Sequence, residues 1–207
     1  MTKLAILSSV EQHTFDKPPK FQKIDRPSYF ALTPDIRRLG FSKLRSPINR
    51  VGFVLQLGYF RATGKFFVAE DFRKRDIQYV YKMLELSGTI DASVYSETSS
   101  KNHRDTILEL SGWVSPNESH EQKLITQLQW FIKQQLSPRK VFEALVEYCW
   151  NSKIVIPSYS KLSGYITDHF NHYEEHLLGI LRSEITQEQN NNPLLARSIN
   201  MTDIILT

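Results

Sequence analysis

A cap residue followed by proline recurs along this 207-residue chain, and each occurrence predicts the start of a helix. The pairs are Thr33-Pro34, Ser46-Pro47 and Ser137-Pro138. A Ser or Thr side chain accepts hydrogen bonds from the free N–H groups of a first helical turn, and proline is tolerated there because it needs no partner for a missing N–H. Apolar residues follow each pair at intervals of three or four. The pattern favours an all-α fold.

The same spacing predicts helices over residues 34–39, 47–63, 70–86, 102–112, 118–135, 138–152 and 158–181. A stretch rich in Ser and Thr at 94–101 indicates a connection between two groups of helices. We therefore expect two small helical subdomains with helix-turn-helix-like packing. The expected parts are a basic extended arm at 1–30, a basic helical subdomain at 31–95, a second helical subdomain at 96–188 and a frayed tail at 189–207.

Cysteine content and hydropathy restrict the cellular setting. The single cysteine, Cys149, cannot form a disulfide within the chain, and it falls on the apolar stripe of the helix expected from Pro138, so we interpret it as structural. No segment approaches the ~20 apolar residues of a membrane span. These features favour a cytoplasmic protein that has no membrane partner.

Charge is distributed unevenly along the chain. From Lys17 to Lys82 there are 15 Lys or Arg residues against 5 Asp or Glu, a net charge of +10. From Met83 to Thr207 there are 10 against 15, a net charge of −5. A basic segment of this kind indicates a polyanionic partner, because Lys and Arg that neutralise phosphates release condensed counterions. The cations of the arm are Lys17, Lys20, Lys23 and Arg26, which could follow a phosphate backbone or a minor groove.

A cluster of three cations, Arg73-Lys74-Arg75, lies near the start of the helix expected at 70–86, so this helix is a candidate for entering a major groove. The helix that begins at Pro47 would be the first helix of a helix-turn-helix motif. The connection between the two helices is, however, longer than the turn of that motif usually is. The complete set of candidate DNA-contacting residues is Arg37, Arg38, Lys43, Arg45, Asn49, Arg50, Arg61, Lys65, Arg73, Lys74, Arg75, Lys82, His103 and Arg104.

Motifs of catalysis are not visible in the sequence. There is no glycine-rich phosphate loop and no His-Glu-x-x-His zinc motif. His172 and His176 are four residues apart beside Glu175, with His169 one turn earlier, so one face of a helix could present them to a cation. Because no distant ligand accompanies them, we interpret the group as an ordinary polar helix face and expect no metal and no cofactor.

The segment from Asn49 to Leu57, continued by Tyr59-Phe60-Arg61, resembles the N-terminal domain of the large replicative transposases of the Tn-three class. Shorter matching segments occur on both sides of it, in the same order along the chain as in that family. They are Ser9 to Gln12, Leu32 to Asp35, His103-Arg104 and Ile154 to Pro157. The resemblance spans residues 8 to about 175.

This resemblance implies helical DNA-binding subdomains that bind the terminal inverted repeats of a transposon. It also implies that the catalytic domain lies downstream and is absent here, so we expect no enzymatic activity. Within the motif, Asn49 and Arg50 could face phosphate or base. Gly52 and Gly58 are expected to permit close helix packing, and the apolar residues between them to form core.

Two hypotheses follow from the sequence. The first is a double-stranded DNA-binding protein, in which phosphate contacts supply most of the affinity and a few helix residues contact bases. The second is a non-catalytic assembly module that binds transposase subunits or a second copy of itself, and that regulates or inhibits transposition by mixed assembly.

Overall fold

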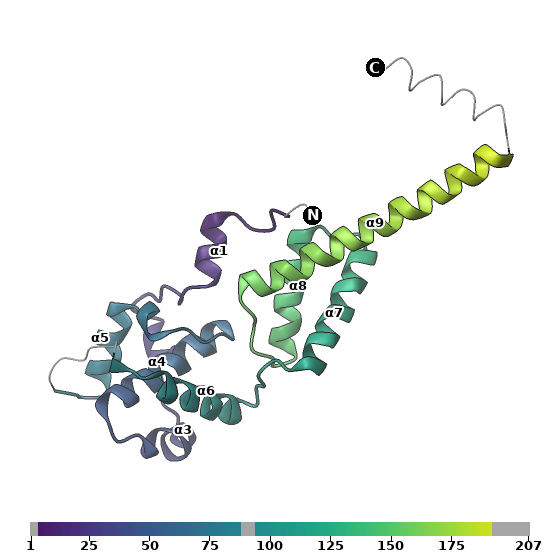
Figure 1. The fold of residues 1–207 in the computed structure, drawn as a ribbon. Helices are drawn as coiled ribbons and strands as arrows, with labels where there is room; N and C mark the ends of the chain where they lie inside the picture. Colours follow the sequence, from purple (N-terminus) through teal and green to yellow (C-terminus); the bar gives the residue numbers. More distant parts are fainter. Residues whose placement is uncertain (1–3, 88–93, 192–207) are drawn as a thin grey trace.

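In the computed structural model, which describes residues 4–87 and 94–191, the chain is a set of helices joined by short connections (Figure 1). No strand occurs among these residues, so the prediction of an all-α fold is confirmed. The α-helices are α1 (Ser9–Phe15), α2 (Arg26–Tyr29), α3 (Pro34–Leu39), α4 (Pro47–Thr63), α5 (Lys74–Met83), α6 (Glu97–Ser111), α7 (Glu118–Lys133), α8 (Pro138–Asn151) and α9 (Tyr159–Asn191). Two 3-10 helices are η1 (Phe41–Lys43) and η2 (Ala69–Asp71).

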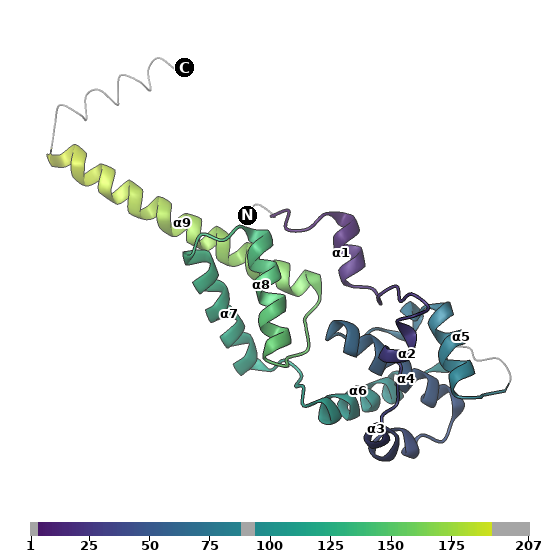
Figure 2. The same ribbon diagram turned by 180° about the vertical axis from the view of Figure 1, so that it is seen from behind.

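Two hydrophobic cores divide the molecule into lobes that lie apart in both views (Figures 1 and 2). The first lobe packs α2 to α6 around α4. The second lobe is a bundle of α7, α8 and α9, against which Ile6 and Phe15 at the two ends of the α1 region also pack. Residues 4–15 therefore pack against the second bundle, whereas Phe21 and Phe30 pack in the first core, so the described part of the expected arm belongs to the two cores.

Helix α6 packs in the first lobe, whereas the sequence-based boundary near residue 95 assigned it to the second. Ile107 and Leu108 are buried in the core around α4. The helix also begins earlier than expected, because the Ser96 hydroxyl accepts the N–H of Ser99 and caps a first turn at Glu97. The first lobe thus continues to Trp113, whose ring packs against Phe60.

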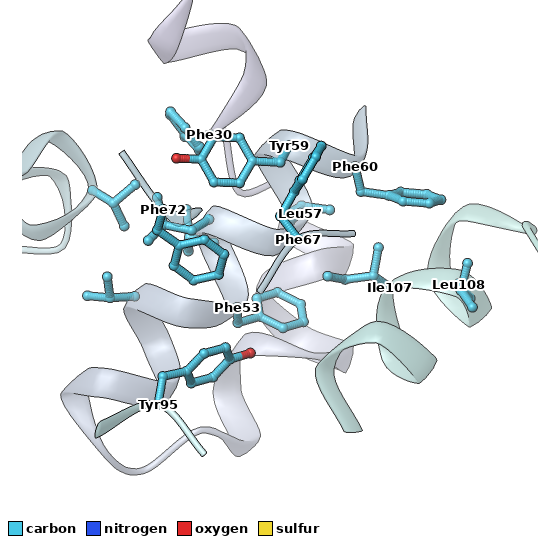
Figure 3. Close-up of a cluster of buried hydrophobic side chains, with 14 residues drawn as sticks. Phe30, Phe53, Leu57, Tyr59, Phe60, Phe67, Phe72, Tyr95, Ile107 and Leu108 are labelled. Carbon is cyan, nitrogen blue, oxygen red and sulfur yellow. The ribbon is translucent and has the colours of Figure 1, made fainter. Parts of the chain in front are cut away.

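Helix α4 is the centre of the first lobe, and its ten residues from Val51 to Phe60 are all buried (Figure 3). Ser46 caps the helix and Pro47 occupies its first turn, as expected. Gly64 ends it in the left-handed region with φ 64°, which glycine adopts without steric cost. A helix that is buried around its whole circumference must be enclosed by neighbours on every side, and its buried Gln56 amide donates to the Phe67 carbonyl at 2.9 Å.

Two glycines of α4 permit close contact with aromatic rings, so the sequence-based expectation of close packing is confirmed. A Cβ atom on Gly58 would lie 2.2 Å from Cδ1 of Phe30, and one on Gly52 would lie 2.5 Å from Cε2 of Tyr95. The neighbours are side chains that follow α2 and precede α6. Because Phe30 is fully buried, its ring could not move away from an added Cβ atom without disturbing its other neighbours.

A buried polar network joins the N-terminal segment to α4 and α5. Asp76, which is fully buried, accepts hydrogen bonds from Arg26 Nε at 2.7 Å and from the Tyr59 hydroxyl at 3.1 Å. The Tyr59 hydroxyl in turn accepts the backbone N–H of Arg73 at 3.1 Å. Burial, with the charge of Asp76, raises the pKa of Tyr59. Arg26 was expected to follow a phosphate backbone, but here it neutralises a buried carboxylate.

The boundaries of two helices differ from the expected ones. α5 begins at Lys74 rather than at residue 70, because Arg73 has extended backbone and the preceding turn is the 3-10 helix η2. The connection from α4 to α5 therefore runs from Gly64 to Arg73. α9 continues to Asn191, well past the expected end at 181 and into the expected tail, of which residues 192–207 lie outside the described part.

Gly58→Ala tests whether α4 depends on close approach. We expect the free energy of unfolding to fall by about 1–3 kcal/mol, because the new methyl group would overpack against Phe30. Urea denaturation measures the change. Gly164→Ala in α9 is the matched control, since nothing lies within 4 Å of its added Cβ and alanine should stabilise the helix by about 0.5–1 kcal/mol. Equal stability of the two variants would contradict this packing.

His103 predicts a pH dependence of stability. Its Nδ1 lies 2.6 Å from the Tyr95 hydroxyl and its ring meets Phe53 edge-on. Burial lowers the pKa of His103 to about 4 from 6.5. Between these two values the unfolded chain binds a proton that the folded chain does not, so stability should fall as pH decreases from 6.5 towards 4.

Thermal unfolding across pH 4.5–6.5 measures this loss, within the interval between about 4 and 6.5 over which His103 titrates. His103→Gln should show a smaller loss over the same interval, because glutamine does not titrate. The exposed His172→Gln on α9 is the control and should behave as the unmodified chain. A loss that is identical in His103→Gln and the unmodified chain would show that another group is responsible.

Candidate nucleic-acid interface

The fourteen candidate residues differ widely in their exposure, which decides whether they are available to a ligand. Half are exposed: Arg37, Arg38, Lys43, Arg45, Lys74, Arg75 and Lys82. Five are half-buried: Asn49, Arg50, Arg61, Arg73 and Arg104. Lys65 and His103 are buried.

Arg73 and Lys65 hold the N-terminal segment in place. Arg73 Nε lies 2.9 Å from the carbonyl oxygens of both Pro18 and Pro19, and another guanidinium nitrogen also donates to Pro18. Lys65 Nζ donates to Asp16 at 2.6 Å and lies over the Phe15 ring. Burial lowers the pKa of Lys65, and the hydrogen bond that Lys65 donates to Asp16 opposes this shift. Both cations are therefore committed to contacts within the chain.

Arg50 and Arg61 bind backbone carbonyls near the two ends of α4. Arg50 Nε donates to Leu44 at 2.9 Å. Arg61 donates to Tyr29 at 2.9 Å and to Ala31 at 2.6 Å, and burial lowers the pKa of its guanidinium. These bonds attach the irregular segments before α3 and α4 to the central helix. Asn49, in the first turn of α4, is half-buried.

The exposed cations of α3, of η1 and of the connection before α4 form the basic segment, which we define as Arg37, Arg38, Lys43 and Arg45. Thr33 caps α3, and Gly40 lets the chain turn closely against α4, since a Cβ there would lie 2.9 Å from the Phe53 ring. Within the described part of the chain, only Arg38 of these four has an ion pair, an exposed one with Asp35 at 3.3 Å. No acidic residue occurs from 36 to 69. The basic segment therefore projects positive charge into solvent.

A second group of cations surrounds the start of α5. Lys74 and Arg75 lie in the first helical turn and are exposed, and no side chain caps this turn. A hollow of about 430 Å³ opens beside them, and the exposed Lys20 and the half-buried Asp71 also line it. Positive side chains at the positive end of a helix dipole favour an anion. Lys82 lies at the other end of α5, so the structure separates it from this group.

Two of the candidate residues lie on α6, where an additional cation lies beside them. His103 is buried beside Tyr95, and Arg104 lies over the Phe66 ring at 5.8 Å. The sequence analysis missed Lys101, one turn before Arg104 on α6, because the helix was expected to begin only at residue 102. Its spacing from Arg104 was the available signal.

No cluster of three or more His, Cys, Asp or Glu side chains suited to a metal is found in residues 4–87 and 94–191. His169 Nδ1 lies 2.9 Å from the Tyr165 carbonyl, and His172 and His176 are exposed. Cys149 is buried in the core of the second lobe, as expected, and burial raises the pKa of its thiol to about 11. None of the described helices is both long and apolar enough to cross a membrane.

The comparison with known families matches both lobes together. The matched region begins at Ile6, in the second core, passes through the whole first lobe and ends at residue 168 within α9. No curated protein matches the chain. The chain belongs to the family described as a domain of unknown function, DUF4158, whose model covers residues 6–168.

Proposed function

We propose that this chain binds double-stranded DNA as the N-terminal part of a transposase and contacts the terminal inverted repeats of a transposon. The observation that carries the proposal is the basic segment. Its four exposed side chains lie within nine residues, with no acidic residue among them. Each Lys or Arg that meets a phosphate displaces condensed counterions, so a segment of this kind favours duplex DNA over a neutral partner.

The group at the start of α5 supports the same proposal. Lys20, Lys74 and Arg75 surround a hollow in which a backbone phosphate would meet both cations and free N–H groups of a helix. Arg73 is not part of this contact, because it binds the carbonyls of Pro18 and Pro19. Base contacts would come from exposed side chains, such as those of the basic segment.

The transposase assignment rests on the resemblance of residues 49–61. In the structure this motif is the core of α4 rather than a DNA-contacting surface, since Val51 to Phe60 are buried. The motif therefore supports a shared fold, and recognition of a particular DNA sequence would depend on the exposed residues. The experiment must accordingly separate specific from non-specific binding.

Charge removal in the basic segment tests whether it binds DNA. The variant changes Arg37, Arg38, Lys43 and Arg45 to Gln, all of which are exposed, so folding should be retained. We expect weaker duplex binding, and a salt dependence of log K shallower by about 0.9 for each phosphate that the variant no longer neutralises. Fluorescence anisotropy across a salt series, with an inverted-repeat duplex and a scrambled duplex, measures both quantities.

The matched control changes four exposed cations of the second lobe to Gln: Lys123, Lys133, Lys140 and Arg182. It removes the same charge, so it should reduce affinity far less if the basic segment binds the phosphates. Equal reductions in the two variants would indicate a general charge effect. A preference of ~10³-fold or more for the inverted repeat is expected of specific recognition, and its absence would remove that part of the proposal.

A second candidate function, an assembly module, is favoured by α9. This helix extends beyond α7 and α8 (Figures 1 and 2), and its apolar side chains past the bundle are 41–52% exposed. They are Leu177, Leu178, Ile180, Leu181 and Ile185. They continue the seam along which Ile166 and Phe170 pack in the second core. The proposed occupant is a second copy of this chain, whose α9 would extend the same helical packing.

Sedimentation velocity tests this candidate. If α9 pairs with α9, the chain should dimerise as its concentration rises, and Leu181→Glu with Ile185→Glu should leave it monomeric. Ser183→Glu with Thr186→Glu adds the same charge to the other side of the helix and should leave the dimer intact. A chain that stays monomeric at all concentrations, or dimers insensitive to the first pair of substitutions, would rule out pairing through this stripe.

A further inference from the structure

A hollow of about 640 Å³ lies between the two lobes. The first lobe contributes α6, through Lys101 and Arg104, and the segment after α4 that contains Phe66. The second lobe contributes Ser115 and Ser158, which precede α7 and α9. The hollow is therefore lined by hydroxyl, cationic and aromatic side chains from both cores.

Half of the charged side chains that line this hollow already have an ion pair. Lys65 pairs with Asp16 at 2.6 Å, and that carboxylate also accepts the N–H of Tyr159. Asp71 pairs with Lys17 at 2.5 Å.

Of the cations that line this hollow, Lys101 and Arg104 have no ion pair with any residue that the structure describes. They lie one turn apart on α6, which places them on one face of the helix. Asp105, the remaining acid at the hollow, is exposed to solvent. The hollow thus retains a positive charge after its internal pairs are counted.

Arg104 is the unusual member of this set. Its Nε is buried and has no hydrogen-bond acceptor in residues 4–87 and 94–191. The guanidinium instead lies over the Phe66 ring, with 5.8 Å from Cζ to the ring centroid. An arginine stays charged at any accessible pH, so it cannot relieve an unmet donor by losing a proton. A buried donor of this kind is costly unless an acceptor arrives from outside.

We propose that the interlobe hollow binds a phosphate group of a DNA strand, held by Arg104 and Lys101. A phosphate offers several acceptor oxygens that match the planar guanidinium, and Lys101 adds a second charge at the mouth of the hollow. The hydroxyls of Ser115 and Ser158 can donate from the second lobe. One phosphate would therefore contact both lobes and hold them at one angle along the duplex. The inference rests on the proposed DNA binding for the source of the phosphate.

The Nε–Hε resonance of Arg104 in a ¹H–¹⁵N NMR spectrum reports directly on this site. Inorganic phosphate is titrated against chloride at constant ionic strength, and a short duplex is titrated separately. Arg104→Gln assigns the resonance by removing it. We expect the Arg104 resonance to move in both titrations, whereas that of Arg50, whose Nε is already bonded to the Leu44 carbonyl, should stay in place.

Lys101→Gln provides a second variant that changes only an exposed side chain. It should raise the midpoint of the phosphate titration by about two- to fivefold, the effect of losing one partly exposed charge pair. The matched control is Lys133→Gln on α7, also exposed, which should leave the midpoint unchanged.

The outcomes separate this site from the proposed function. If the Arg104 resonance moves with duplex alone, the phosphate is supplied by a DNA strand. If it moves with inorganic phosphate but the chain does not bind duplex, the site is supported and the proposed function fails. Duplex binding by anisotropy without any movement of Arg104 overturns the site and leaves the function standing. An Lys101→Gln midpoint equal to that of Lys133→Gln also overturns it.

Discussion

The enclosure of α4 is the constraint on which the rest of the first lobe depends. Ten consecutive residues of this helix are buried, so neighbours must cover every side of it. Short helices and irregular segments provide part of this cover, and such segments carry many backbone groups that need partners. Arg50 and Arg61 satisfy carbonyls of these segments, and Asp76 receives both Arg26 and Tyr59. The polar residues around α4 therefore act first as supports of an apolar helix.

This support explains why the basic half of the chain is less available than its charge suggests. Arg26, Arg73 and Lys65 bind groups of the same chain, and each joins residues about fifty positions apart. The cations left in solvent are gathered on α3 and η1 and around the start of α5. Fewer cations are thus exposed than the sequence contains in this half of the chain. Those that are exposed lie close together, and concentrated positive charge favours contact with phosphates.

The two lobes meet through both polar and apolar contacts, and the Trp113 ring of the first lobe packs edge-on against Trp150 of the second. Asp16 binds Lys65 of the first lobe and the N–H of Tyr159 at the start of α9, and Ile156 donates to the Gly64 carbonyl. The hollow beside these interactions contains the unmatched Arg104. A ligand bound there would add a further contact between the two lobes. Binding of DNA and orientation of the lobes are therefore physically linked in the proposed function.

The helical class and the structural role of Cys149 could be predicted from the sequence, because caps, spacing and composition act locally. Thr33, Ser46 and Ser137 each cap a helix as expected. The division into two cores could not be predicted, because Ile6 packs with α7 to α9 and α6 packs with α4, although these residues are far apart in the sequence. The same holds for the candidate site: the sequence identified the cations, but only the fold decided that Lys65 and Arg73 bind groups of the chain while Lys43 and Lys74 are exposed. A charged side chain looks the same in a sequence whether its partner is water, a carbonyl or a phosphate, and tertiary packing determines which of these it meets.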